Sequence, residues 1–264
     1  MHQIKENDCL GAWKSATSYL LSNGGDIFNL MIQIDDPCHF DPAWMKDYSP
    51  KNIALSGGSR GDDIRDVVHT IFPMKYAQSI KDKDEIYARY LQTHLRGGRL
   101  GSRKNGRWGT YFLRLICFAP NAAIKKAIDP RASLNDVSKQ RKDFFGDNNQ
   151  IDRVINALGN WQNSPKAAIY CHISGAHLDS MQPLGSPCLQ YIQFTQPSAK
   201  KVDMTVVYRS HDYFNKALGN FIGLGQLLKF VCDASGKNPG TLTCHAIRAY
   251  HESSQKHLKQ LLGV

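Results

Sequence analysis

The sequence lacks a long hydrophobic run. No stretch approaches the ~20 apolar residues that a membrane-spanning helix needs, and residues 1–13 lack the apolar core of a secretory signal. It also lacks a Cys-x-x-Cys pair, because its seven cysteines lie far apart. These absences argue against a zinc site and a membrane protein. We therefore expect a cytoplasmic protein with reduced thiols, no metal and no membrane partner.

Acidic side chains are the scarcer charged class. The chain of 264 residues has 33 lysines and arginines against 23 aspartates and glutamates, which gives a formal net charge of +10. Such an excess favours an anionic partner, namely a nucleotide phosphate, a polyanionic cofactor or a nucleic acid. Charge alone does not choose among these three.

Two glycine-containing segments carry arginines that could meet such an anion. Residues 96–107 are basic and glycine-rich, and we expect a flexible loop that either approaches phosphates or is simply solvated. Trp108 and Tyr111 follow it and offer rings on which a base could stack. Upstream, Arg60 precedes an expected helix start, where an anion could also bind, although a lone Gly-Gly-Ser-Arg is a weak signal.

Repeats and linker-like segments are missing too, so we expect one domain over residues 1–264. Apolar residues at helical spacing predict helices at 10–21, 62–72, 151–161, 214–232 and near the C-terminus. Strands are expected at 28–34, 110–118, 167–174, 188–194 and 202–209. Because helices and strands are interspersed without strict alternation, the predicted fold class is α+β, with helices packed on a mixed sheet.

A set of short motifs in the second half of the chain resembles the thymidylate synthase family. Pro187-Cys188, Gln193-Phe194, Arg209-Ser210-His211-Asp212 and Asn220 follow the family's P-C, Q-F, R-S-x-D and asparagine in order and spacing. The similarity runs over Ile151–His257 and, more weakly, Arg65–Thr70. Each motif alone is a weak signal, whereas the combination is fairly specific. The resemblance implies a thymidylate synthase-like sheet, one face of which is used for homodimerisation.

The resemblance also implies a chemistry. The Cys188 thiolate would add to C6 of a uracil-type ring, so that C5 attacks a one-carbon unit carried by 5,10-methylenetetrahydrofolate. Arg209 would lower the thiol pKa and, with Ser210, bind the nucleotide phosphate. Asp212 and Asn220 would contact the base, and the Asn220 amide leans toward uracil over cytosine. The bland alternatives are an inert buried cysteine, an arginine in a surface ion pair and an aspartate that caps a helix.

The sequence departs from the family where recognition and proton transfer are concerned. The family's catalytic glutamate aligns with Thr70, and a hydroxyl cannot replace a carboxylate as acid or base near neutral pH. The other mismatches are Leu189 for a histidine, Ala167 and Ala168 for an arginine pair, and His245-Ala246-Ile247-Arg248-Ala249 for the ribose-binding D-x-H-x-Y segment. His245, Arg248 or His251 could re-create contacts to a different substrate, but we favour their interpretation as surface polar residues of the last helix. The chain also stops at Val264, before the family's tail over folate.

Two functions fit these residues. The first is a pyrimidine C5 methyl- or hydroxymethyltransferase that uses Cys188 on a substrate other than free dUMP, such as a modified nucleotide or a base within a larger molecule. The alternative is a catalytically impaired homologue that binds a nucleotide or a nucleic acid. The missing glutamate and arginine pair favour the second function, and the retained cysteine and R-S-x-D motifs favour the first.

Overall fold

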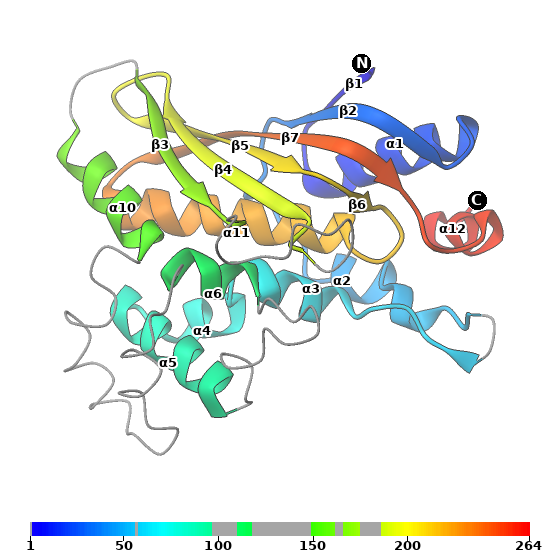
Figure 1. Cartoon of the computed structure of the whole chain (residues 1–264), viewed down its shortest axis with the longest axis horizontal. Coiled ribbons are helices and arrows are strands. Elements are labelled where there is room, and N and C mark those ends of the chain that lie inside the picture. The colour runs from blue at the N-terminus through cyan, green and yellow to red at the C-terminus, as the bar shows by residue number, and fades with distance from the viewer. Residues whose placement is uncertain (1, 56–57, 97–109, 118–148, 162–165, 175–185) are drawn as a thin grey trace.

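The computed structural model describes residues 2–55, 58–96, 110–117, 149–161, 166–174 and 186–264. Their strands form a mixed sheet in the order β1-β2-β7-β5-β4-β3, with β6 beside β7 (Figure 1). The β1–β2, β5–β7 and β6–β7 pairs are parallel, and the other neighbours are antiparallel. The strands are β1 (His2–Glu6), β2 (Asp26–Ile34), β3 (Lys166–His172), β4 (Leu189–Gln196), β5 (Lys201–Tyr208), β6 (His211–Asp212) and β7 (Asn238–Tyr250).

Helices pack against the sheet around a long central helix. Figure 1 shows α11 running beneath the strands, with α10 beside it and α3 and α6 further from the sheet on the same side. The helices are α1 (Cys9–Ser22), α2 (Trp44–Asp47), α3 (Ile64–Ile71), α4 (Met74–Ser79), α5 (Lys83–Arg96), α6 (Tyr111–Ile116), α10 (Gln150–Asn160), α11 (Ala217–Ser235) and α12 (Gln255–Leu262), with a short 3-10 turn at Pro50–Asn52. The mixed sheet and packed helices are compatible with the predicted α+β class. Within the described ranges, no helix is both long and apolar enough to cross a membrane.

The core lies between the sheet and α11. Along β5, Val202, Met204, Val206 and Tyr208 are fully buried, while the residues between them are half-buried on the other face. This period of two places alternate side chains against the helices. The opposite face carries exposed apolar side chains, including Tyr170 of β3 and Ile247 of β7.

Two glycines allow α3 to approach α11 closely. A Cβ on Gly219 would stand 2.8 Å from the Val67 Cβ, and one on Gly223 would stand 2.9 Å from the Ile71 Cβ. These separations are shorter than ordinary van der Waals contacts, so larger residues would push the two helices apart. The close packing brings one face of α3 to the N-terminal end of α11, where the candidate site lies.

Most of the predicted elements are confirmed: α1, α3, α10, α11 and α12, and strands β2 to β5. The strand predicted at 110–118 is wrong, because residues 111–116 form helix α6, whose N-cap Thr110 accepts a hydrogen bond from the Leu113 amide. All residues of α6 are buried, and five of the six are apolar, so the segment gave no periodicity to separate helix from strand. Strands β1 and β7 and helix α5 were not predicted.

The placement of His245 and Arg248 on the last helix is also wrong. Both lie on β7, and His251 precedes α12. His245 Nε2 is 3.1 Å from Asn29 Oδ1, and the Arg248 Nε is 3.0 Å from an Asp26 carboxylate oxygen. The predicted basic loop beyond Arg96, and Trp108 after it, lie outside the described residues.

Candidate active site

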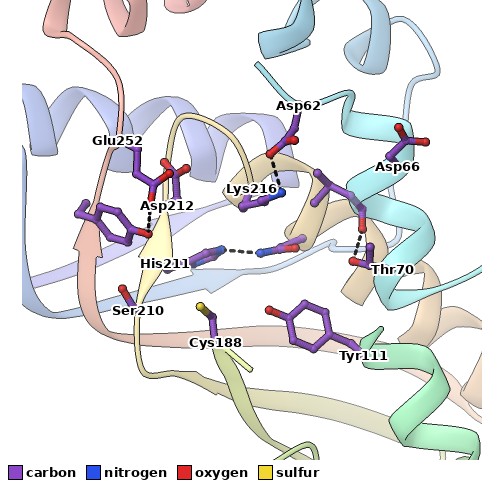
Figure 2. Close-up of a pocket in the computed structure, with 13 residues that line it drawn as sticks. Asp62, Asp66, Thr70, Tyr111, Cys188, Ser210, His211, Asp212, Lys216 and Glu252 are labelled. Carbon is purple, nitrogen blue, oxygen red and sulfur yellow. Dashed lines mark hydrogen bonds and ion pairs between the residues drawn. The ribbon is translucent and has the colours of Figure 1, made fainter. Parts of the chain in front are cut away.

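A cavity of about 320 Å³ opens where β4 begins, β6 and β7 end, and α3 meets the N-terminal end of α11. Figure 2 shows its side chains converging from these elements. The lining residues are Asp62, Asp66, Val67, Thr70, Tyr111, Cys188, Ser210, His211, Asp212, Lys216, Asn220, Tyr250 and Glu252. The fold therefore brings together Cys188, Ser210, Asp212, Asn220 and Tyr111, which the sequence singled out from distant positions.

Cys188 is half-buried and immediately precedes β4. Burial raises the pKa of its thiol, the positive charge of Arg209 opposes that rise, and the negative charge of Glu252 adds to it. The net pKa lies above the ordinary value. The expected effect of Arg209 is thus present but smaller than the effect of burial. Without a ligand, the Cys188 side chain is mainly a thiol at neutral pH.

Arg209 hydrogen-bonds to the backbone of the two residues that precede Cys188 in the sequence. Its Nε donates to the Pro187 carbonyl oxygen at 3.2 Å, and its Nη2 donates to that of Ser186 at 3.1 Å. Its own backbone amide donates to the carbonyl oxygen of Cys188 at 2.9 Å. Arg209 is not among the residues that line the cavity. Its guanidinium is thus engaged with the backbone of residues 186 and 187.

Tyr111 lies beside the cysteine rather than at an outer stacking face. The backbone amides of Cys188 and Leu189 hydrogen-bond to its hydroxyl, and burial raises the pKa of that hydroxyl well above its ordinary range. Figure 2 shows the ring directed toward Cys188 from α6. Tyr111 therefore remains a neutral phenol that fixes the start of β4.

Asp212 shapes the turn that leads into α11. Its carboxylate accepts hydrogen bonds from the Phe214 amide at 2.9 Å and from Asn215 Nδ2 at 3.0 Å. Lys216, not Asp212, occupies the N-cap position of α11. Burial raises the pKa of Asp212 despite these hydrogen bonds. Asp212 thus orders the segment between β6 and α11 and also faces the cavity.

Asn220 lies in the first turns of α11, and its amide faces His211. The Asn220 Nδ2 is 3.0 Å from His211 Nε2, and both side chains are buried. Ser210, just before β6, is half-buried at the cavity wall. The sequence reading assigned no role to His211, which occupies the variable position of the R-S-x-D motif.

The cavity contains more carboxylates than the motifs indicate. Thr70 reaches it, but its hydroxyl donates to the Val67 carbonyl at 2.7 Å. Asp66 lies one helical turn before Thr70 and also lines the cavity, which its spacing of four residues could have signalled. Asp62 forms an ion pair of 2.5 Å with Lys216, and Glu252 accepts a hydrogen bond from the Tyr250 hydroxyl at 3.1 Å.

Some predicted residues lie away from this cavity. Arg60 is exposed in a bridge with Ala54 and is not among the lining residues. Tyr250 and Glu252, rather than residues 245–249, reach the cavity from the end of β7. Within the described residues, no group of three or more His, Cys, Asp or Glu side chains has the arrangement of a metal site.

Comparison with known proteins gives a partial match. The chain is 30% identical over 109 residues to a protein of Methanosarcina barkeri and 36% identical over 101 residues to one of Methanocaldococcus jannaschii, both named "Putative thymidylate synthase". These matches cover 41% and 38% of this chain, and 48% and 45% of those proteins. No protein-family profile matches the chain. The chain thus spans about half the length of the curated relatives it matches, and it shows a distant thymidylate synthase-like relationship.

Proposed function

We propose that the chain is a thymidylate synthase-like transferase that moves a one-carbon unit to C5 of a pyrimidine, with Cys188 as nucleophile. The observation that carries the proposal is the shared cavity of Cys188, Asn220 and Asp212. A volume of about 320 Å³ is at the small end of ligand sites, which are about 300–1,000 Å³. It suits one pyrimidine nucleoside.

The chemistry begins at the thiol of Cys188. Loss of its proton gives a thiolate that adds to C6 of the ring, which leaves C5 electron-rich and able to attack an electrophilic carbon. Loss of the C5 proton and departure of the thiolate then restore the ring. Because the Cys188 pKa is raised, a neighbouring group must accept the first proton. Asp66 and Glu252 are carboxylates of the same cavity that could exchange protons, whereas Thr70 could not.

The substrate is best described as a pyrimidine outside the ordinary free dUMP. Among the described lining residues, the only lysine or arginine is Lys216, and it pairs with Asp62. Asp66, Asp212 and Glu252 add acidic groups to the same wall. These residues would give the phosphate group of a free nucleotide little electrostatic attraction. A nucleoside, or a base in a larger molecule, would place no free phosphate group in the cavity.

One pyrimidine nucleoside accounts for the described lining of the cavity, and none of these residues is assigned to 5,10-methylenetetrahydrofolate. The one-carbon donor that the resemblance implies stays a hypothesis.

A test of the proposed function uses 5-fluoropyrimidines. Once C5 of such a ring has attacked a one-carbon unit, C5 carries fluorine in place of the proton that must leave, so the thiol adduct is retained. The protein is incubated with 5-fluoro-dUMP, with 5-fluoro-2′-deoxyuridine and with an oligonucleotide containing 5-fluorouracil, each with and without methylenetetrahydrofolate. Intact-protein and peptide mass spectrometry should locate an adduct on Cys188. Cys38→Ser is the matched control, because Cys38 is the other half-buried thiol. No adduct with any of the three would contradict the proposal.

The alternative, a nucleotide- or nucleic-acid-binding homologue without turnover, is favoured by one observation. The residue in place of the family's glutamate, Thr70, hydrogen-bonds back to its own helix and cannot act as a base. The net charge of +10 also suits an anionic partner. Binding of a nucleic acid with a steep salt dependence, together with no adduct, would support this alternative.

We also propose a homodimer through the sheet face opposite α11. Tyr170 and Tyr191 stack on this face with ring centroids 6.1 Å apart, and Tyr170 and Ile247 are exposed. A second copy would cover these apolar side chains, as the resemblance implies. Sedimentation of the wild type should give a dimer that Tyr170→Asp weakens, and a monomeric wild type at high concentration would contradict the proposal.

A further inference from the structure

We propose that His211 is a positioning residue that fixes the amide orientation of Asn220 and so makes the cavity select a uracil-type ring over a cytosine-type ring. The inference rests on the proposed function of the cavity. His211 occupies the variable position of the R-S-x-D motif, and Asn220 would contact the N3–C4 edge of the pyrimidine.

The two side chains form a buried hydrogen-bonded pair in the cavity wall. Asn220 Nδ2 lies 3.0 Å from His211 Nε2, and the side chains are only 3% and 1% exposed. The link joins β6 to the first turns of α11. Both residues line the same cavity as Cys188. A change at His211 is therefore transmitted directly to the amide that would meet the ring.

The imidazole has little freedom to turn. It stacks on Tyr208 with centroids 4.1 Å apart and an interplanar angle of 4°. The Phe221 ring meets it edge-on at 5.5 Å, and the Tyr213 ring lies 5.1 Å away. Three aromatic neighbours on different sides hold the ring plane. The position of Nε2 is thus set by packing.

Burial also fixes the charge of the ring. It lowers the pKa of His211 to about 3, so the imidazole is neutral at physiological pH and only one of its nitrogens carries a proton. Nδ1 is buried and has no hydrogen-bond partner among the described residues. If Nε2 accepts the hydrogen bond from Asn220, the proton of the imidazole lies on Nδ1. The amide nitrogen of Asn220 is then held toward the imidazole, and its amide oxygen points away from it.

A fixed amide distinguishes the two pyrimidines. A uracil-type ring offers an N3–H donor and an O4 acceptor, whereas a cytosine-type ring offers an N3 acceptor and an amino donor. An amide can complement either edge, because a half-turn exchanges its NH₂ and its oxygen. With its proton on Nδ1, His211 permits only one of these orientations, because its Nε2 can then only accept. Position 220 carries an asparagine rather than an aspartate. We therefore assign the orientation in which the amide oxygen of Asn220 accepts a hydrogen bond from N3–H.

The first test measures ligand discrimination. The dissociation constants of dUMP, dCMP and the two corresponding deoxynucleosides are compared in the wild type, His211→Phe and His211→Gln. Phe keeps the aromatic packing and removes Nε2, so the preference for uracil should fall about tenfold. Gln places an acceptor oxygen near the position of Nε2 and should restore part of the preference. An unchanged preference in His211→Phe would overturn the inference.

The second test needs no ligand and separates the two proposals. Nitrogen-15 NMR of the wild type at pH 7 should show Nε2 of His211 unprotonated and Nδ1 protonated, with the Asn220 amide hydrogen-bonded. A protonated Nε2 would overturn the inference even if the cavity binds pyrimidines. A wild type that binds none of the four ligands and no uracil-containing oligonucleotide would instead contradict the proposed function, and the tautomer would still decide whether His211 orients Asn220.

Discussion

The guanidinium of Arg209 donates to the carbonyl oxygens of Pro187 and Ser186, which places a permanent cation directly behind the turn that presents Cys188. The same charge lowers the pKa of the Cys188 thiol, against the larger rise caused by burial. Arg209 therefore affects Cys188 in two ways. Its hydrogen bonds hold the backbone of residues 186 and 187, and its positive charge lowers the thiol pKa.

Removing this cation should make Cys188 less reactive. In Arg209→Met the thiol pKa rises, so alkylation of Cys188 by iodoacetamide at pH 8 should slow by about three- to tenfold. Peptide mass spectrometry at timed intervals measures the rate, with Cys38 in the same sample as internal reference. The matched control is Arg248→Met, which removes an arginine that pairs with Asp26 outside the cavity. Equal rates in wild type and Arg209→Met would contradict the assignment.

Removing Glu252 should have the opposite sign. Its carboxylate raises the pKa of Cys188, so Glu252→Gln should lower that pKa and speed alkylation at pH 8 severalfold. Glutamine can still accept the hydrogen bond from Tyr250, which preserves the local geometry. The pH profile of the alkylation rate reads the pKa directly. A rate profile of Glu252→Gln displaced to higher pH than that of the wild type would refute the proposed effect of the Glu252 charge on the Cys188 pKa.

The close contact of α3 and α11 predicts a stability change. Gly219→Ala puts a methyl group 2.8 Å from the Val67 Cβ and should cost about 1–3 kcal/mol of the free energy of unfolding. Gly159→Ala on α10 is the matched control, since its nearest neighbour would be 3.8 Å away, and it should stabilise by about 0.5–1 kcal/mol. Urea unfolding measures both, and equal effects would show that the approach of the helices is not tight.

The neutral state of His211 predicts a dependence of stability on pH. Its pKa is about 3 in the folded protein and about 6.5 in the unfolded chain, so the unfolded state binds the extra proton. Stability is therefore lost as pH falls from about 6.5 toward 3, with a slope from this group of at most about 1.4 kcal/mol per pH unit. His211→Phe should remove that slope, whereas replacement of the exposed His39 by Gln should keep it. Parallel curves for wild type and His211→Phe would refute this account.

Much of the candidate site could be predicted from the sequence, because it depends on short-range spacing. Cys188, Asp212 and Asn220 follow motifs with fixed intervals. The predicted strand β4, which Cys188 immediately precedes, and the predicted helix α11, which carries Asn220, were confirmed, whereas β6, which carries Asp212, was not predicted. The partners from other elements could not be predicted this way. Asp66 reaches the cavity through the packing of α3 on α11, and Glu252 reaches it at the end of β7, which the sequence reading missed.

The missed strand had a readable signal. In β7, Leu242, Cys244 and Ala246 are buried and alternate with half-buried polar residues, which is the period of a strand. Helix α6 had none, since every residue from Tyr111 to Ile116 is buried. Such a run is compatible with either structure, and only tertiary packing decides it.

The most direct test of the account follows the C5 proton of the ring. Addition of the Cys188 thiolate to C6 lets C5 take up a deuteron from D₂O. Loss of the original C5 proton and departure of the thiolate then return the ring with deuterium at C5, without any one-carbon donor. Proton NMR of dUMP, deoxyuridine and a uracil-containing oligonucleotide should show loss of the H5 signal with wild type and Cys38→Ser, but not with Cys188→Ser. Retention of H5 in all three ligands with wild type, or its loss with Cys188→Ser, would contradict the central claim.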